Sequence, residues 1–162
     1  MNSPYIILGI DPSLRGTGYA VIRRDGSTRL RALTWGVIKN SSQLKMETCL
    51  LQIYETLQNV IQTYQPHCAA IEKIIYVQSH SIAITLGCAQ GAALLAVAQS
   101  HLDLFEYAPR QIKLAATGLG AARKNQVGFM VRALLELNTT PPPDASDALA
   151  IAITHAQKFR LK

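Results

Sequence analysis

The stretch that decides the fold is YIILGIDPSLRGTGYAVI, residues 5–22. Its first apolar run ends on a single acid, Asp11, and a second apolar run follows Gly16 and Gly18. Two apolar runs separated by a short glycine-bearing segment are typical of adjacent strands, and we expect the two glycines to form a tight turn. Because an isolated carboxylate at the end of a core strand is unfavourable, Asp11 needs a cation or a hydrogen-bond donor beside it.

Turn signals and hydrophobic periodicity along the rest of the chain predict a mixed α/β architecture. The dipeptide Asp25-Gly26 is a hairpin signal, which makes the first three strands an antiparallel meander. Beyond it, strands alternate with helices, so we expect a three-layer α/β domain over residues 1–162 with a mixed five-stranded sheet. The predicted strands span 5–11, 18–24, 29–38, 68–71 and 102–107, and the predicted helices span 44–64, 79–100, a short stretch after Pro109, 125–137 and 144–158.

Charge and hydropathy narrow the class of partner. The 162 residues carry sixteen Lys and Arg against ten Asp and Glu, which gives a net charge of +6 and a pI near 9.4 and favours a polyanionic partner. No segment reaches the roughly 18 uninterrupted apolar residues of a membrane span, and the N-terminus lacks the features of a secretory leader. We therefore expect a cytoplasmic protein without a membrane partner, in which Cys49, Cys68 and Cys88 are reduced, buried thiols.

Four acids stand beside or inside apolar runs. Asp11 and Glu72 each end an apolar strand, so their carboxylates meet at one edge of the sheet if the two strands are neighbours. Asp144 and Asp147 are three residues apart at the start of the last predicted helix and share a face. Four carboxylates in one place repel one another unless divalent cations with oxygen ligands relieve the charge. Two Mg²⁺ ions held in this way are typical of in-line phosphodiester hydrolysis.

Each acid also has a simpler interpretation when it is taken alone. Asp144 follows three prolines and suits a helix N-cap, Asp147 suits the helix dipole, and Asp11 precedes a proline and suits an Asx turn. Glu72 has the weakest alternative, because it ends an apolar segment. His155, two turns beyond Asp147, is too distant to ligate the same ion, and we assign it to packing or dimer contacts. The metal-site hypothesis therefore depends on the four acids as a set.

Several blocks of the sequence resemble the RuvC family of bacterial Holliday junction resolvases. In chain order they are GIDPSLRGTGYAVI, AIEKIIY, LGCAQGAALLAVA, FEYAPRQIKLAATGLGAARKNQV and DASDALAIAITH. The resemblance implies an RNase H-like fold, a homodimer, and paired symmetric cuts in four-way DNA junctions during recombination and repair. It implies two Mg²⁺ ions per site, with Mn²⁺ as a substitute, and a branch-migration motor as a partner. Its four catalytic and metal-binding acids fall on Asp11, Glu72, Asp144 and Asp147, which the charge argument also selects.

The resemblance also implies DNA contacts around these acids. Lys113 in APRQIK and Lys124 in AARKNQ match basic positions of the family, where they would hold phosphates or stabilise transition-state charge. A solvated surface charge is the alternative for each lysine. Arg123 would strengthen phosphate binding, and Arg15 would face the phosphates where the glycine turn lets a DNA backbone approach.

One position departs from the family pattern. After the AIE motif, family members often carry an aromatic residue that stacks on bases at the junction centre. Here the aligned residue is Ile75, and Tyr76 follows it. Three interpretations stay open: Tyr76 stacks, Ile75 wedges between bases, or the junction opens less readily. Plain core packing of Ile74 and Ile75 is the alternative.

Other functions compete with a junction nuclease. The pattern D-x-x-x-x-G-x-G-Y at Asp11 is also found in actin-like ATPases and sugar kinases, but those enzymes need two such domains and an adenosine site. A scaffold that binds junctions without cutting them and a nuclease of the same fold that acts on structured RNA are the remaining alternatives. For the dimer, the predicted helix 79–100 carries Gly87 and Gly91 and could pack closely against a second copy or against its own sheet.

Overall fold

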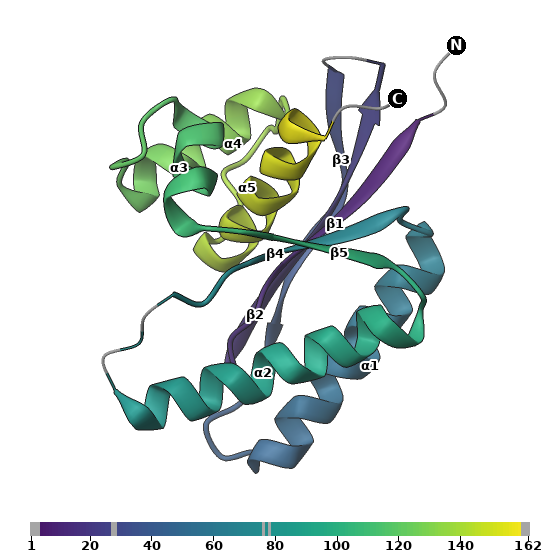
Figure 1. The fold of residues 1–162 in the computed structure, drawn as a ribbon, viewed down its shortest axis with the longest axis vertical. Helices are drawn as coiled ribbons and strands as arrows, with labels where there is room; N and C mark the ends of the chain where they lie inside the picture. Colours follow the sequence, from purple (N-terminus) through teal and green to yellow (C-terminus); the bar gives the residue numbers. More distant parts are fainter. Residues whose placement is uncertain (1–3, 27–28, 76, 78, 160–162) are drawn as a thin grey trace.

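The computed structural model describes residues 4–26, 29–75, 77 and 79–159, which form one mixed sheet with helices on both faces (Figure 1). The strands are β1 (Tyr5–Asp11), β2 (Gly16–Asp25), β3 (Arg29–Lys39), β4 (Cys68–Glu72) and β5 (Asp103–Tyr107). The helices are α1 (Met46–Tyr64), α2 (His80–Gln99), α3 (Pro109–Thr117), α4 (Lys124–Leu134) and α5 (Pro143–Lys158). The strand order is β3-β2-β1-β4-β5. The predicted three-layer α/β fold with a mixed five-stranded sheet is confirmed.

The two sides of the sheet differ in strand direction. β1, β2 and β3 form the predicted antiparallel meander, whereas β4 runs parallel to β1 and β5 runs parallel to β4. Ile10 of β1 pairs with Ile71 of β4, so the next residue of each strand lies at the same edge of the sheet. These next residues are Asp11 and Glu72. The register therefore brings the two strand-end carboxylates to neighbouring positions.

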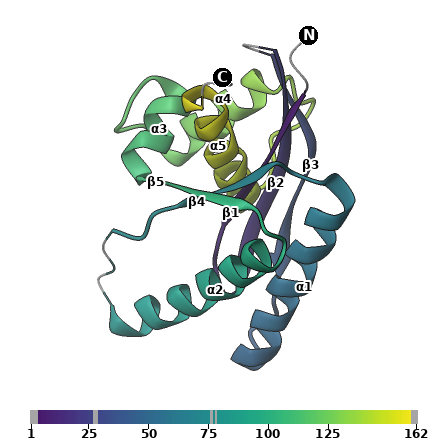
Figure 2. The same ribbon diagram turned by 45° about the vertical axis from the view of Figure 1, so that its right-hand side comes forward.

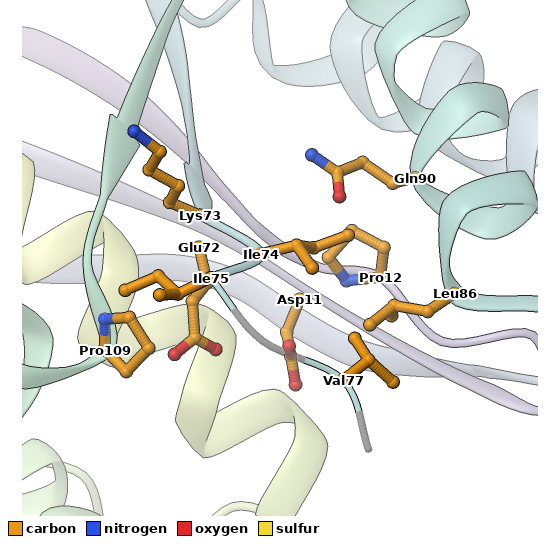
Figure 3. Close-up of a pocket in the computed structure, with 10 residues that line it drawn as sticks. All are labelled: Asp11, Pro12, Glu72, Lys73, Ile74, Ile75, Val77, Leu86, Gln90 and Pro109. Carbon is orange, nitrogen blue, oxygen red and sulfur yellow. The ribbon is translucent and has the colours of Figure 1, made fainter. Parts of the chain in front are cut away.

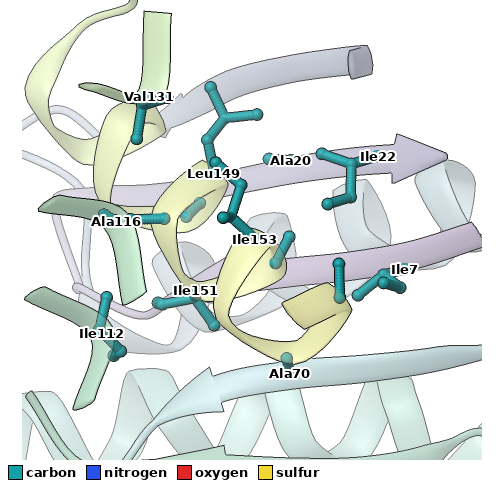
Figure 4. Packing of buried hydrophobic residues seen from close by; sticks show 14 of the residues in the cluster. Ile7, Ala20, Ile22, Ala70, Ile112, Ala116, Val131, Leu149, Ile151 and Ile153 are labelled. Carbon is teal, nitrogen blue, oxygen red and sulfur yellow. The ribbon is translucent and has the colours of Figure 1, made fainter. Parts of the chain in front are cut away.

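Two apolar clusters hold the layers together, one on each face of the sheet. On one face, α3, α4 and α5 pack against residues such as Ile7, Ile22 and Ala70 (Figure 4). On the other face, α1 and α2 pack against residues such as Leu8 and Val21. The turned view shows the two helix groups on opposite sides of the strands (Figure 2). Alternate residues of the same strands thus serve both cores, which explains why the central strands β1 and β4 are apolar up to their final acid.

α5 lies unusually close to the sheet because glycines face it. A Cβ added to Gly18 would lie 1.9 Å from the carbonyl oxygen of Asp144, and one added to Gly9 would lie 2.2 Å from that of Ala148. Gly16 and Gly18 belong to β2 and form no tight turn, so that part of the sequence prediction is wrong. The physical reason is a tertiary one. The absence of a side chain admits the helix start that carries Asp144, rather than a DNA backbone.

α2 covers the opposite face only in part. Four of its residues are buried, namely Ala89, Ala93, Ala96 and Val97. Among the described residues, a Cβ on Gly87 or Gly91 would meet nothing within 4 Å, so packing of these glycines against the chain's own sheet is excluded. By length and composition α2 could also cross a membrane, with a mean hydropathy of 1.8, but one such helix is weak evidence because core helices share these properties. Here its buried residues pack in the cluster that contains α1 and the sheet.

An aromatic cluster closes the core at the far end of α5. His155 is completely buried, and its ring stacks on Phe159 and contacts Phe105. The Tyr107 hydroxyl is 2.8 Å from His155 Nδ1, and Tyr5 stacks on Phe159. Burial, with a smaller contribution from the positive charge of Arg24, lowers the pKa of His155 to about 4. Packing, one of the two roles considered for His155, is therefore confirmed.

Two further details differ from the sequence predictions. α4 ends at Leu134, three residues before the predicted boundary, and Leu135 caps it. Cys49 and Cys68 are buried free thiols as expected, whereas Cys88 is only half-buried because α2 is incompletely covered. Tyr76, a candidate for base stacking, lies outside the described residues.

Candidate active site

Three separate parts of the chain bring the acids together. Asp11 ends β1 and Glu72 ends β4, and the parallel pairing of these strands puts them side by side. The start of α5 supplies the other two acids. Three prolines lead into it, and the Ser146 hydroxyl donates to the Pro141 carbonyl oxygen at 3.1 Å. Proline at the first helical position fixes the backbone before the helix begins, so the first turn of α5 is held in a defined place.

The acids do not occupy equivalent places. Asp11, Glu72 and Asp147 line one cavity of about 190 Å³, together with Lys113 and Lys124. Asp144 lies to one side, against β2. A Cβ added to Gly16 would be 2.9 Å from Asp144 Oδ2. The four predicted acids are therefore gathered in one region, with three of them around a shared space.

The electrostatics of the site show uncompensated negative charge. The pKa of Asp11 is raised to about 7, first by burial and then by the negative charges of Asp147 and Glu72. The pKa of Glu72 is also raised, first by burial and then by Asp147. Like charges in a partly desolvated place disfavour the ionised form of each group. A cation in this space would reverse the effect, because it favours every carboxylate in its charged form.

Two lysines supply part of the missing positive charge. Lys124 Nζ is 3.1 Å from Asp147 Oδ2, and this hydrogen bond is the main reason why the pKa of Lys124 is raised. Lys113 on α3 lowers the pKa of Glu72 through its charge. Lys124 stands at the start of α4, where the Gln126 side chain accepts a hydrogen bond from the Arg123 amide at 2.8 Å. The structure thus places both predicted lysines at the acids.

A second cavity of about 380 Å³ adjoins the first and shares Asp11, Glu72 and Pro109 with it. Figure 3 shows the two carboxylates at one side of this space, with mostly apolar side chains and the polar side chains of Lys73 and Gln90 around the rest. Ile75 lines the cavity and is 66% exposed, and Ile74 is also exposed. Core packing of Ile74 and Ile75 is therefore excluded. Ile75 follows β4 and lies next to the acids, so a ligand bound at the acids could also contact its exposed side chain.

Two arginines of the predicted DNA-binding set lie away from both cavities. The Arg15 guanidinium donates to the Ser41 carbonyl oxygen and, at 3.2 Å, to that of Leu44. These hydrogen bonds connect the segment between β1 and β2 to the loop before α1. Arg123 is exposed at the N-cap of α4, next to Lys124. Phosphate contacts by Arg15 and Arg123 stay predictions.

The donor set suits a hard divalent cation by its chemistry. All four candidate ligands are carboxylates, and Mg²⁺ prefers oxygen donors. Within the described ranges, no three His, Cys, Asp or Glu side chains stand close enough to form a closed set around a metal ion. Asp147 is instead paired with Lys124 at 3.1 Å. Asp11 and Glu72 share a cavity and have raised pKa values, so a cation bound there would stabilise their charged forms.

One residue that lines the larger cavity, Gln90, is not predicted by the sequence patterns. Its side chain reaches from α2 into the larger cavity (Figure 3). A signal was present, because Gln90 is the one amide in the otherwise small and apolar segment LGCAQGAALLAVA. The position of Gln90 in the cavity could not be predicted, because nothing in the local sequence indicates that α2 passes beside the end of β4.

Comparison with known proteins identifies the family of this chain. The family model for crossover junction endodeoxyribonuclease RuvC matches residues 7–155. A protein of that name from Akkermansia muciniphila is 50% identical over 149 residues, covering 92% of this chain and 89% of its own length. The Treponema pallidum protein of that name is 47% identical over 151 residues, covering 93% and 76%.

Solved structures give the same result. The structure described as T. thermophilus RuvC in complex with Holliday junction substrate superposes with a TM-score of 0.88 at 33% identity, covering 94% of this chain and 93% of that chain. A further Thermus thermophilus RuvC structure gives a TM-score of 0.83 at 33% identity, covering 93% of each chain. With this fold, this acidic site and these relatives, the chain belongs to the RuvC family of crossover junction endodeoxyribonucleases, which are metal-dependent nucleases of RNase H-like fold.

Proposed function

We propose that this chain resolves four-way DNA junctions in recombination and repair, by paired symmetric hydrolysis of phosphodiester bonds. The observation that carries the proposal is the cavity where Asp11, Glu72 and Asp147 face Lys113 and Lys124. Hydrolysis of a nucleic acid needs acidic side chains that can hold metal ions and basic side chains that can hold phosphates, and both kinds line this one cavity.

In the proposed mechanism the chain's own groups divide the work. Asp11, Glu72, Asp144 and Asp147 would hold two Mg²⁺ ions, for which Mn²⁺ would substitute, and such ions supply Lewis-acid stabilisation and an activated water when bound. Lys124 exchanges Asp147 for a phosphate oxygen of the DNA. Lys113 holds a second oxygen and offsets the charge that develops in the transition state. Arg123, exposed beside Lys124, extends the phosphate contacts along the strand.

A homodimer would supply the two sites that paired cuts need. The exposed face of α2 supports it, because Ile84 and Leu95 are 62% and 58% exposed and flank the open Gly87 and Gly91. These residues follow one another at helical spacing and form an apolar stripe with a flat centre. A branch-migration motor as partner and a cytoplasmic location complete the proposal. The motor rests on the family resemblance, and the location rests on the free thiols of Cys49, Cys68 and Cys88.

The proposal is tested with a synthetic four-way DNA junction, incubated with and without Mg²⁺. Asp11→Asn, Glu72→Gln and Asp147→Asn should each lower the cleavage rate by about 10³-fold or more while junction affinity is retained, since each removes a ligand charge. Glu55→Gln, the same type of change on the exposed face of α1, is the matched control and should cut like the wild type.

Each other outcome points to a different function. Cleavage at the wild-type rate by any of the three site variants contradicts the assignment of the site. A wild-type protein that binds the junction in Mg²⁺ or Mn²⁺ without cutting it is a scaffold. Faster cutting of structured RNA than of the DNA junction identifies an RNA nuclease of the same fold.

A further inference from the structure

The larger cavity next to the acids has an unusual lining. Its walls are mainly apolar and include Ile74, Ile75 and Leu86, and Gln90 brings a carboxamide into it from α2 (Figure 3). In the described part of the chain, the Gln90 side chain makes no hydrogen bond, although the residue is half-buried. Apolar walls with a few convergent polar groups are typical of a small-molecule pocket.

The chemistry of this lining fits a flat ring that carries hydrogen-bonding atoms along its edge. Ile75, exposed by 66%, offers an apolar surface on which a flat ring can lie. A carboxamide donates and accepts side by side, which matches the edge of a nucleobase. An apolar peptide side chain would cover the isoleucines but would leave the Gln90 amide unpaired, and an unpaired polar group reduces affinity.

The position of the cavity identifies where such a base would come from. It shares Asp11, Glu72 and Pro109 with the smaller cavity, in which the two lysines lie. A strand whose phosphate is held at the acids therefore has its neighbouring nucleotide at the mouth of the larger cavity. The volume, about 380 Å³, accommodates one unstacked base.

We propose that the larger cavity is the seat of one nucleobase of the cut strand, next to the scissile phosphate, and that Gln90 reads the edge of this base. The inference rests on the proposed junction-cutting activity and adds a residue that determines which sequence is cut. Specificity of this kind arises because a base without the matching edge leaves the carboxamide unpaired.

The first experiment uses a pool of four-way junctions with randomised bases around the crossover, whose cut products are sequenced. Wild type should favour one base at a position next to the cut. Gln90→Leu, which keeps the volume, should slow cutting of the favoured sequence by about 5- to 100-fold and flatten the preference there, while disfavoured sequences and junction affinity change less than about twofold. Gln90→Glu should shift the preference toward bases with an exocyclic amino donor, because a carboxylate only accepts.

Gln52→Leu, the same change on the exposed face of α1, is the matched control and should leave the profile unchanged. An unchanged profile in Gln90→Leu protein that cuts normally overturns the inference and leaves the proposed function intact. Failure of wild type to cut any junction overturns the proposed function instead.

The second experiment does not need cleavage. The Asp147→Asn variant, altered outside the larger cavity, is bound to junctions with 2-aminopurine at successive positions near the crossover. One position should gain fluorescence on binding, since the base leaves its stack, and Gln90→Leu in the same background should reduce that gain. No gain at any position overturns the base seat, whatever the cleavage result.

Discussion

α5 and α2 are alanine-rich helices on opposite faces of one sheet, and they are used differently. α5 is buried at most positions from Ala145 to Ala156, whereas α2 buries only four of its twenty residues. A helix packed on all sides has one position, so the acids at its start are held in a defined place. A helix packed on one side keeps surface for other contacts. The chain therefore puts two of the four proposed metal-binding acids, Asp144 and Asp147, on the fixed helix and its free apolar face on the other.

The difference arises in the sheet rather than in the helices. Gly9 and Gly18 remove the side chains that would keep α5 at the usual distance, so its backbone approaches the strands directly. On the other face, Leu8, Ile10 and Val21 project from the same strands and hold α1 and α2 at side-chain distance. α2 also lies at the edge of the layer, with α1 as its main neighbour (Figure 2).

The largest effect is expected from a side chain placed under α5. In Gly18→Ala, the new Cβ meets the Asp144 carbonyl oxygen, a backbone atom that cannot move alone, so α5 must shift. We expect the free energy of unfolding, measured by chemical denaturation, to fall by about 3 kcal/mol or more. We also expect the folded molecules of this variant to cleave junctions more slowly than the wild type, because the shift of α5 displaces Asp144 and Asp147. Gly87→Ala, the same change in open space on α2, is the control, and equal stabilities of the two variants would refute the close approach of α5.

The far end of α5 offers a smaller, pH-dependent test. The pKa of His155 is about 4 in the fold, because of burial and the charge of Arg24, and near 6.5 in the unfolded chain. Below pH 6.5 the unfolded chain therefore binds a proton that the folded chain excludes. The stabilisation is present above pH 6.5 and is lost as the pH falls toward 4.

His155→Phe removes this titration from the aromatic cluster. Between pH 6.5 and 4.5 the wild type should lose about 2 kcal/mol of unfolding free energy relative to the variant, measured by denaturation without divalent metal. The comparison is needed because the raised pKa values of Asp11 and Glu72 act in the opposite direction, stabilising the fold as the pH falls. Parallel pH curves for wild type and variant would show that His155 is hydrated in the fold.

These contrasts also show how far the sequence alone could lead. Strand periodicity and the Asp25-Gly26 turn predicted the meander, because both are local signals. Asp11 and Glu72 were found because a charge that ends an apolar strand is costly wherever the strand lies. Their meeting depended on β1 and β4 being neighbours, which the fold provides.

The features that the sequence did not predict all depend on tertiary contacts between distant parts of the chain. The sequence predicts a turn at Gly16 and Gly18 because closely spaced glycines often mark one, but their role depends on a helix more than 120 residues further along the chain. Arg15 binds carbonyl groups of the loop before α1, and no local pattern indicates these partners, while its phosphate contact stays a prediction. Gln90 reaches its cavity only because α2 passes beside the end of β4. A local pattern cannot specify such distant partners.

The smallest expected effect tests whether the free face of α2 is an interface. In Gly91→Ala the new methyl group meets no atom within 4 Å in the described part of the chain, so the change should raise the free energy of unfolding of the monomer by about 0.5 to 1 kcal/mol through helix propensity. The same methyl group would separate two copies that approach closely at Gly87 and Gly91. Sedimentation should then show a dimer dissociation constant several-fold above that of the wild type. A variant that is less stable as a monomer would place Gly91 in the chain's own core, and an unchanged dissociation constant would move the dimer contact to another surface.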